Sequence, residues 1–323
     1  MLEAMFNAKV GDDVFEEDPT VKALEEKAAA LFGKEAAIYC PSGTMTNQIA
    51  IKILTQPGQE IIFEKTSHIY YYEVGGIAFN SGLSMRMING DRGRIKSEDV
   101  LENINPDNVH MPVTSMVSLE NTCNKGGGSY YDIETIRDIS EVCKKNNLKL
   151  HLDGARIFNA ITEANYAPTE VGKYFDTISV CLSKGLGAPV GSVLLSTKEN
   201  IKKARRVRKV FGGGMRQAGY LAAAGIYALD NNIARLKEDH KRAKAIGKAL
   251  SGLPFIEEVL PVDSNIIVFK LIAKITVDDF LAKLASHDIR AVAFGKQTIR
   301  MVTHLDISDD MVEYTIKVLN ILK

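Results

Sequence analysis

Short apolar runs alternate along the chain with longer stretches in which apolar residues recur every third or fourth position. The short runs predict strands at residues 36–40, 60–63, 115–119, 148–152, 177–182 and 192–195. The longer stretches predict helices at residues 20–31, 46–54, 133–145, 198–208, 215–230 and 234–250. Apolar strands between helices are typical of a mostly parallel sheet covered on both faces. The pattern therefore predicts a three-layer αβα domain.

The pattern changes near Leu253 and Pro254. Beyond this point it predicts strands at residues 264–271 and around 300–303, a helix at 277–286 and a last helix from Asp309. This order favours a small C-terminal α/β domain. We place the large domain at residues 1–240 and the small one at 241–323. The helix at 234–250 belongs to either domain or bridges both, and the N-terminal segment packs within the large domain or on the small one.

Composition narrows the classes of function. The chain has 323 residues, 46% of them hydrophobic, which is ample for a large core. Lys plus Arg equal Asp plus Glu at 40 each, so nothing favours a nucleic acid or a membrane as partner. We find neither a signal peptide nor an apolar run near the ~18 residues of a membrane span. Four cysteines without a Cys-x-x-Cys pair are typical of a reduced cytoplasmic protein, and no metal site is expected.

A lysine follows one of the predicted strands. The run Thr177-Ile-Ser-Val-Cys-Leu-Ser-Lys184 leads from an apolar strand into the lysine, and a glycine-rich turn comes next. Burying a lysine costs free energy because its charged ammonium group loses its hydration. An unprotonated lysine amine attacks carbonyl groups and forms Schiff bases, with substrates or with pyridoxal phosphate (PLP). Lys184 is therefore a candidate reactive amine.

A carboxylate has a matching position in the preceding predicted strand. Asp153 follows the strand at 148–152, and ligands of open α/β sheets bind at the carboxyl ends of strands. A carboxylate there can keep the ring nitrogen of PLP protonated. Aspartate also commonly caps helices, which would be the simpler interpretation of Asp153 alone. Its pairing with Lys184, 31 residues later, favours the catalytic one.

Two turns have the composition of phosphate sites. Pro41-Ser-Gly-Thr44 lies between a predicted strand and a helix, where free N–H groups bind anions. Gly212-Gly-Gly-Met-Arg216 places an arginine at another helix start. An ordinary helix cap and a flexible turn are the alternatives.

Two histidines and an arginine are further candidates. His68 lies among polar and aromatic residues, where an imidazole can stack on a ring and exchange protons. His110, before the strand at 115–119, is equally well a loop or core histidine. Arg300 lies in an apolar strand, where it can clamp a carboxylate or form an internal ion pair.

Together these motifs resemble the threonine aldolases, fold-type I PLP enzymes related to the β-eliminating lyases. The resemblance covers nearly the whole chain. The segments that carry it are Val10-Gly-Asp-Asp-Val14, Pro41-Ser-Gly-Thr44, Ser67-His68, Ser118-Leu-Glu-Asn-Thr122, Asp153-Gly-Ala-Arg-Ile-Phe-Asn159, Ser183-Lys-Gly-Leu-Gly187, Gly212-Gly-Gly-Met-Arg-Gln217 and Arg300-Met-Val-Thr-His-Leu-Asp306.

The resemblance implies a role for each candidate residue. It implies a Schiff base between PLP and Lys184, an Asp153 contact to the pyridine nitrogen, and His68 stacked on the ring. It also implies a homotetramer built from dimers, with active sites completed across a subunit boundary. The remaining implied roles are phosphate binding by Gly43, Thr44 and Arg216, binding of the substrate carboxylate by Arg156 and Arg300, and a position near the substrate hydroxyl for His110.

The activity that the resemblance implies is cleavage of threonine or allo-threonine into glycine and acetaldehyde by a carbon–carbon lyase of the low-specificity or L-allo type. Two departures from the family pattern keep alternatives open. The usual opening Arg-Ser-Asp-Thr-Val-Thr does not precede Met1, and the usual Glu-Asn-Thr-His-Asn reads Glu120-Asn-Thr-Cys123-Asn124. The alternatives are β-elimination or decarboxylation of another amino acid, and a PLP-binding homologue with impaired turnover.

Overall fold

Two sheets organise the computed structural model, which describes residues 1–322. Within these residues the larger sheet has seven strands in the order β1-β7-β6-β5-β4-β2-β3. Strand β7 runs antiparallel to both of its neighbours and the other pairings are parallel. The strands are β1 (Ala36–Cys40), β2 (Glu60–Glu64), β3 (Ser84–Ile88), β4 (Thr114–Glu120), β5 (Lys149–Gly154), β6 (Thr177–Cys181) and β7 (Ser192–Ser196).

The six strands predicted for the large sheet are confirmed, and β3 is the strand that the pattern did not reveal. It lies at the edge of the sheet, and its residues other than Ile88 are partly or fully exposed. An edge strand needs no continuous apolar run, so periodicity gives little signal for it.

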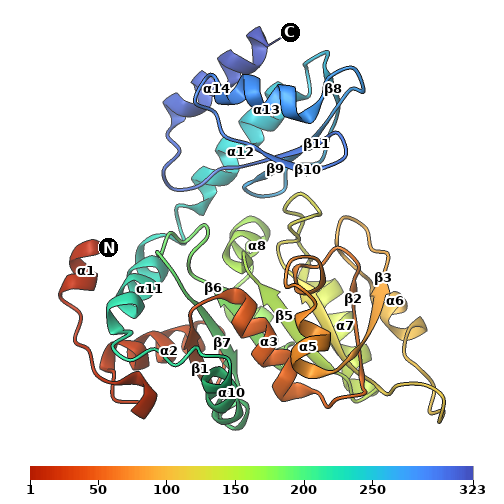
Figure 1. The fold of residues 1–323 in the computed structure, drawn as a ribbon, viewed down its shortest axis with the longest axis vertical. Helices are drawn as coiled ribbons and strands as arrows, with labels where there is room; N and C mark the ends of the chain where they lie inside the picture. The colour runs from red at the N-terminus through yellow and green to blue at the C-terminus, as the bar shows by residue number, and fades with distance from the viewer. Residues whose placement is uncertain (323) are drawn as a thin grey trace.

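Helices cover both faces of the large sheet, as the three-layer prediction requires (Figure 1). The alternation along β1 shows the two faces: Ala37 and Tyr39 join the cluster packed under α2, α7, α8 and α11, whereas Ile38 and Cys40 pack under α3 and α10. The longer helices of this part are α2 (Pro19–Leu31), α3 (Gly43–Leu54), α7 (Ile133–Lys145), α10 (Lys198–Val210) and α11 (Gly219–Asn231). The shorter ones are α1 (Leu2–Phe6), a 3₁₀ turn (Asp13–Phe15), α4 (His68–Tyr71), α5 (Gly76–Ser81), α6 (Ser97–Glu102), α8 (Ile157–Ala164) and α9 (Pro168–Gly172).

Local signals explain where two of these helices begin. Asp18 accepts hydrogen bonds from the backbone N–H groups of Thr20 and Val21, and Pro19 occupies the first turn of α2. Ser42 caps α3 by accepting from the N–H of Met45 at 3.2 Å. The predicted start of the 215–230 helix is too early, because Gly212–Arg216 forms a turn and α11 begins only at Gly219.

The small sheet is antiparallel, in the order β10-β11-β9-β8 among the described residues, and confirms the small C-terminal α/β part. Its hydrophobic cluster is separate from those of the large sheet. Strands β8 and β10, which are short and mostly exposed, were not predicted. The elements are β8 (Ile256–Val259), β9 (Ile266–Leu271), α13 (Val277–Ala285), β10 (Val292–Gly295), β11 (Thr298–Val302) and α14 (Asp309–Ile321).

Helix α12 (Leu236–Leu250) connects the two parts (Figure 1). Leu236 packs in the large cluster, whereas Ala243, Ile246 and Leu250 pack in the small one. The domain boundary after residue 240 falls within this helix and stays a prediction. Helix α1 lies against α11, and Met1 packs on the large cluster, so the N-terminal segment does not cover the small part.

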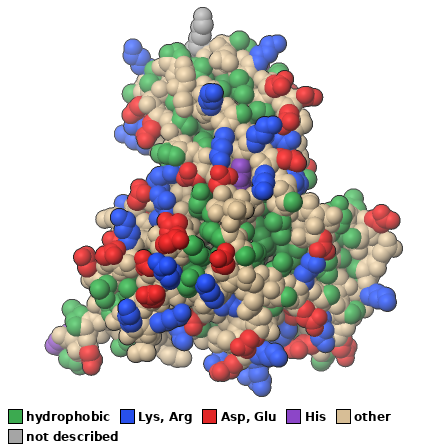
Figure 2. Space-filling view, turned by 180° about the vertical axis from the view of Figure 1, so that it is seen from behind, with side chains coloured by type: hydrophobic (Ala, Val, Ile, Leu, Met, Phe, Trp, Pro, Cys, Tyr) green, Lys and Arg blue, Asp and Glu red, His purple; other side chains and the backbone are tan. Residues whose placement is uncertain are grey.

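The surface carries both signs of charge in mixture. Figure 2 shows basic and acidic side chains interspersed over both parts on the face it presents. Within residues 1–322, no helix combines the length and the apolar character that crossing a membrane requires.

Candidate active site

The carboxyl ends of three neighbouring parallel strands bring charged groups to one edge of the large sheet. Glu120 ends β4 and lies in register with Asp153 of β5. Lys184 follows β6, the strand that pairs with β5. It lies in a turn that is closed by a 2.9 Å hydrogen bond from the N–H of Gly187 to the carbonyl of Lys184. Gly187 has a φ of +75°, a conformation that favours glycine. The sheet topology thus places an amine beside two carboxylates.

Two cavities adjoin at this edge, and His68 and Lys184 line both. The smaller, about 180 Å³, lies over the start of α3 and the end of β5. The larger, about 410 Å³, lies between the two parts of the chain. Of the sequence-predicted residues, the smaller cavity also contains Gly43, Thr44 and Asp153, and the larger contains Arg156 and Arg300.

Asp153 is 2% exposed and firmly held. Its Oδ1 accepts a hydrogen bond from the N–H of Ala155 at 3.1 Å, and its Oδ2 accepts from Asn47 Nδ2 at 2.9 Å. Its contact with the N–H two residues onward matches the local capping geometry that aspartate favours. Because it also lines the smaller cavity, the carboxylate is positioned to face a bound ring.

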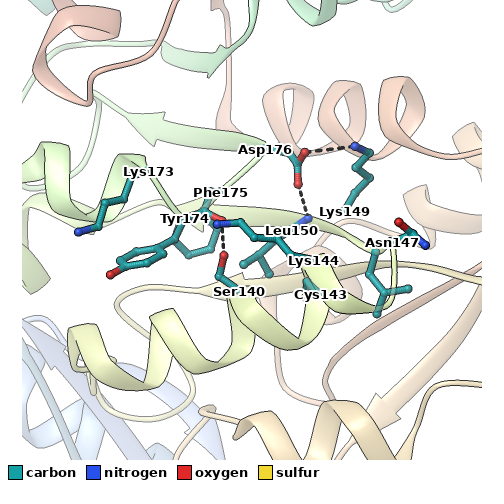
Figure 3. A pocket seen from close by; sticks show the side chains of 11 residues that line it. Ser140, Cys143, Lys144, Asn147, Lys149, Leu150, Lys173, Tyr174, Phe175 and Asp176 are labelled. Carbon is teal, nitrogen blue, oxygen red and sulfur yellow. Dashed lines mark hydrogen bonds and ion pairs between the residues drawn. The ribbon is translucent and has the colours of Figure 1, made fainter.

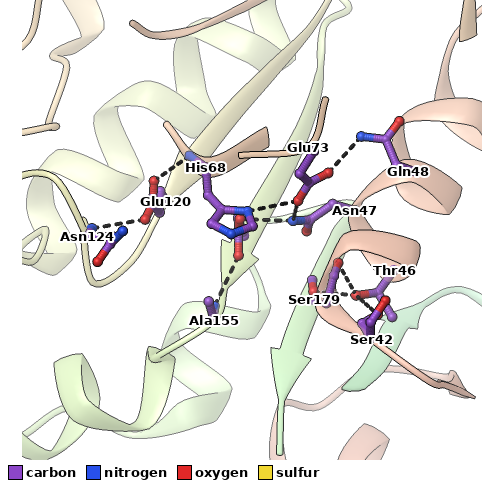
Figure 4. A network of polar contacts seen from close by, with 12 residues as sticks. Ser42, Thr46, Asn47, Gln48, His68, Glu73, Glu120, Asn124, Ala155 and Ser179 are labelled. Carbon is purple, nitrogen blue, oxygen red and sulfur yellow. Dashed lines mark hydrogen bonds and ion pairs between the residues drawn. The ribbon is translucent and has the colours of Figure 1, made fainter. Parts of the chain in front are cut away.

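His68 lies at the start of α4 between buried carboxylates (Figure 4). Its Nδ1 is 2.9 Å from Glu73 Oε1, and its backbone N–H donates to Glu120 Oε2 at 2.8 Å. Burial by itself lowers the pKa of His68, but the hydrogen bond to Glu73 and the charge of Asp153 outweigh it, so the pKa is raised.

Glu120 supplies the one carboxyl group among the described residues that line the larger cavity. Burial raises the pKa of this carboxyl group, and the nearby charge of Asp153 raises it further, to about 7. The hydrogen bonds that it accepts from the backbone N–H groups of Asn124 and His68 lower the pKa, but by less. A carboxyl group with such a pKa exchanges protons near neutral pH. No role for Glu120 was predicted from the sequence, because its burial depends on neighbouring strands.

The smaller cavity has an anion-binding end. Strand β1 leads through Ser42 into α3, so the first N–H groups of that helix border the cavity. The donor set as a whole fits PLP: a helix start for the phosphate, a buried carboxylate for the ring nitrogen and an amine for the aldehyde.

Two arginines line the larger cavity, and Arg300 has a spare donor. Arg300 Nη1 donates to Asn124 Oδ1 at 2.6 Å, and its buried Nε has no partner among the described residues. The Arg300 side chain also lies over the Phe294 ring, 4.8 Å from its centroid. Burial and then the charge of Arg300 lower the pKa of Arg156, consistent with two cations facing one space. Such a pair suits a substrate carboxylate.

The structure does not bring Arg216 and His110 into these cavities. Arg216 forms an ion pair with Asp12, and its side chain is more than half exposed. His110 is exposed in the loop before β4, whereas Glu120 is at the carboxyl end of that strand. Figure 1 shows the segment between α6 and β4 protruding from the large part. Their implied roles are therefore not explained by this single chain.

A further cavity, of about 370 Å³, lies at the opposite edge of the large sheet (Figure 3). Asp176, just before β6, accepts there from the N–H of Leu150 at 2.8 Å and from Lys149. Ser140 donates to the Tyr174 carbonyl at 3.0 Å. The polar groups of this cavity bind one another, and we assign it no catalytic role.

Comparison with known proteins indicates the same class of enzyme as the donor set of the two cavities does. Residues 1–273 match the family described as beta-eliminating lyase. The chain is 42% identical over 310 residues to the low specificity L-threonine aldolase of Escherichia coli K12, covering 95% of this chain and 90% of the relative. It is 39% identical over 323 residues to a probable low-specificity L-threonine aldolase of Arabidopsis thaliana, covering 98% and 91%.

Solved structures show the same fold. A putative L-allo-threonine aldolase from Listeria monocytogenes superposes with a TM-score of 0.84 at 21% identity, covering 98% of this chain and 91% of that one. A structure described as SPT with a PLP internal aldimine gives a TM-score of 0.77 at 16% identity, covering 98% and 80%. At these identities the likeness concerns the fold alone.

Proposed function

The chain belongs to the beta-eliminating lyase family, with threonine aldolases as full-length relatives, and from this premise we propose that it cleaves threonine or allo-threonine into glycine and acetaldehyde with the help of PLP. Other β-hydroxy-α-amino acids would give glycine and the corresponding aldehyde. The observation that carries the proposal is the pair of adjoining cavities, which share Lys184 and His68. One has the groups for a cofactor and the other has the groups for an amino-acid carboxylate.

We assign the smaller cavity to the cofactor. Lys184 would hold it covalently, Asp153 would bind its ring nitrogen, and His68 would lie against the ring. The start of α3, at Gly43 and Thr44, would bind the phosphate. When bound, PLP withdraws electrons from the substrate's Cα, so that one bond at this carbon can break without a free carbanion forming.

The larger cavity would fix the amino acid. Arg156 and Arg300 grip its carboxylate, which orients the substrate about its Cα. This orientation would decide which bond to Cα is cleaved when the cofactor is bound. Presenting the Cα–Cβ bond rather than the bond to the carboxylate would favour aldol cleavage over decarboxylation.

Aldol cleavage needs a base for the proton of the β-hydroxyl. His68 is the candidate within the chain, because its Nδ1 is held by Glu73 and its other ring nitrogen is left for the cavity. A water positioned by His68 and a His110 contributed by another subunit are the alternatives.

We propose that His110 and Arg216 act in an oligomer, a dimer of dimers. The loop of His110 protrudes and exposes Val109 at 94% and Val113 at 66%, which favours a protein contact there. Arg216 is likewise on the surface of the single chain. Because all four cysteines are buried and unpaired, we place the protein in the cytoplasm.

The decisive experiment measures glycine release from each of the four threonine stereoisomers by the purified protein. We expect glycine and acetaldehyde in equal amounts, and a visible absorption band that borohydride reduction removes while leaving the cofactor covalently attached to Lys184. Pyruvate with ammonia, or an amine with carbon dioxide, would instead identify β-elimination or decarboxylation. An absorption band without any product would identify a binding protein.

A matched pair of lysine variants makes the test specific. Lys184→Ala should lose both the covalent link and turnover. Lys173→Ala, in the cavity at the opposite sheet edge, should keep both. A Lys184→Ala protein that still releases glycine from threonine would refute the assignment.

A further inference from the structure

Glu73 is a buried carboxylate in direct contact with His68, and the assignments above name it only as the partner of Nδ1. Its side chain is fully buried and accepts three hydrogen bonds (Figure 4). His68 Nδ1 and Asn47 Nδ2 both lie 2.9 Å from Oε1, and Gln48 Nε2 lies 2.7 Å from Oε2. A carboxylate that accepts from three donors requires a proton on Nδ1 of the histidine. The contact therefore fixes both the ring orientation and the tautomer of His68.

The backbone beside Glu73 is strained. Val74 has a φ of +54° and a side chain that is 98% exposed, and Gly75 follows with a φ of +72°. A β-branched residue in the left-handed region costs about 1–3 kcal/mol and persists only where its surroundings impose it. The exposed Val74 side chain gains no burial in return. The turn instead directs Glu73 into the interior.

Asn47 connects this pair to Asp153. Its Nδ2 donates to Glu73 Oε1 and to Asp153 Oδ2, both at 2.9 Å. Its Oδ1 lies 3.1 Å from His151 Nε2, and His151 Nδ1 lies 2.8 Å from the Thr177 hydroxyl. Burial lowers the pKa of His151 to about 4, so this ring is neutral and donates once. The arrangement fixes which way the Asn47 amide points.

His68, Glu73 and Asp153 are also close enough to hold a metal ion, since their ligand atoms lie within 4.8 Å of one another. The hydrogen bonds of these three residues argue against a metal ion at this place. The Asn47 amide donates to both carboxylates, and the histidine Nδ1 faces one of them. A cation between them would displace donors already in place.

We propose that Glu73 is a positioning residue for aldol cleavage: it holds Nδ1 of His68 protonated, directs Nε2 to the cavity, and is linked through Asn47 to the carboxylate that faces the ring nitrogen. This inference rests on the proposed function for its catalytic meaning. Its structural content, the Glu73–His68 pair, stands independently.

Several other groups face His68 and bear on its protonation. These groups come from every element packed around His68, and the variants used in the experiment must leave all of them in place. They are Tyr72 after α4, Glu120 on β4, Asp153 on β5, Arg156 at α8, Lys184 after β6 and Arg300 on β11.

The experiment replaces Glu73 by Gln in the full-length holoenzyme and follows His68 by histidine-selective isotope labelling and NMR. His68→Gln identifies the signal. In wild type we expect Nδ1 to carry the proton in the neutral ring and the pKa to lie above the ordinary histidine value. Glu73→Gln should populate the other tautomer and lower the His68 pKa by about one unit or more, because an opposite charge within hydrogen-bond distance is lost.

Turnover supplies a second readout. Glu73→Gln should lower kcat by roughly 10- to 100-fold, move the acidic limb of the pH profile of kcat/KM downward, and leave KM within a few-fold. Glu73→Asp should restore part of the tautomer preference and part of kcat. Glu64→Gln is the matched control, because Glu64 is an equally buried carboxylate that accepts from Thr66 outside the cavities.

The outcomes separate the two claims. An unchanged His68 tautomer and pKa in Glu73→Gln would overturn the positioning role, whatever the turnover. If Glu73→Gln does not fold, the same titration of Glu73→Ala decides, because it also removes the carboxylate, and a His68 signal identical to wild type overturns the role. A shifted His68 in a protein that releases no glycine from threonine would support the pair and refute the proposed activity.

Discussion

The two sides of the candidate active site differ in how firmly their charged groups are held. On the large sheet, Asp153 and His68 each have buried partners, and Asn47 links their networks. On the small sheet, Arg300 has a single hydrogen bond to Asn124 and a buried Nε without a partner among the described residues. An unpaired buried donor costs free energy that a bound anion would recover. The side that we assign to the cofactor is thus preorganised, whereas the side that we assign to the substrate keeps a donor for a ligand.

The largest effect should follow from disturbing the preorganised side. We expect Asp153→Asn to lower kcat for glycine release by roughly 10²–10³, because a fixed charge facing the ring nitrogen acts directly on the reacting electrons. Asp176→Asn, at the opposite sheet edge, is the matched control and should stay within twofold of wild type. Steady-state rates with saturating cofactor measure both. A loss below tenfold for Asp153→Asn would contradict the difference between the two sides.

A substitution on the side that we assign to the substrate should change KM rather than kcat. Arg300→Lys keeps the charge but loses the forked donors, so KM for threonine should rise roughly 10- to 100-fold. The absorption band of the bound cofactor should not change, since Arg300 lines only the larger cavity. Arg290→Lys, on an exposed residue of the small part, serves as control. A changed band with an unchanged KM would place Arg300 on the cofactor side.

The network behind the cofactor side should make stability depend on pH. Burial lowers the pKa of His151 to about 4, from an unfolded value near 6.5. The unfolded chain therefore binds this proton first, and stability falls as the pH drops from about 6.5 toward 4, by at most about 1.4 kcal/mol per pH unit. Urea unfolding across this range measures the slope, which His151→Gln should reduce. An equal slope in the variant would show that His151 is not the titrating group.

The smallest effect should come from an ion pair that joins the large part of the chain to the small part. Arg92, after β3, binds Asp263 at 2.7 Å and donates to the Pro261 carbonyl at 2.8 Å in the small part. Asp263→Asn should lower the free energy of unfolding by about 1 kcal/mol or less, since both side chains are partly exposed. Denaturant titration checks this value, with KM unchanged. A tenfold rise in KM would instead show that this ion pair sets the spacing of the substrate side.

Periodicity was enough to predict most of the fold. Buried strands such as β1 and β7 contain runs of consecutive apolar residues, and amphipathic helices such as α7 repeat apolar residues every three to four positions. Strands β3, β8 and β10 were missed because their residues are largely exposed. Short helices such as α4 and α5 carry too few turns for a period to show.

The site was predictable only where a residue's chemistry is unusual for its place. A lysine after an apolar strand and an aspartate at a strand end gave such signals, and both lie in the cavities. Glu73 gave none, although its position five residues after His68 could have suggested a contact across α4. The role of His110 rests on the family resemblance, and that of Arg216 on the resemblance and on its predicted place at a helix start, because one chain does not bring these residues to the cavities.

The sequence by itself determined the αβα architecture, the small C-terminal part and the choice of a candidate amine and carboxylate, because these depend on local periodicity and residue type. Only the tertiary structure decided which carboxylate faces which donor. Asn47 meets Glu73 across 26 residues of sequence and Asp153 across 106. Such contacts arise from the order of strands and the crossing of α3 over their ends, and no local pattern encodes them.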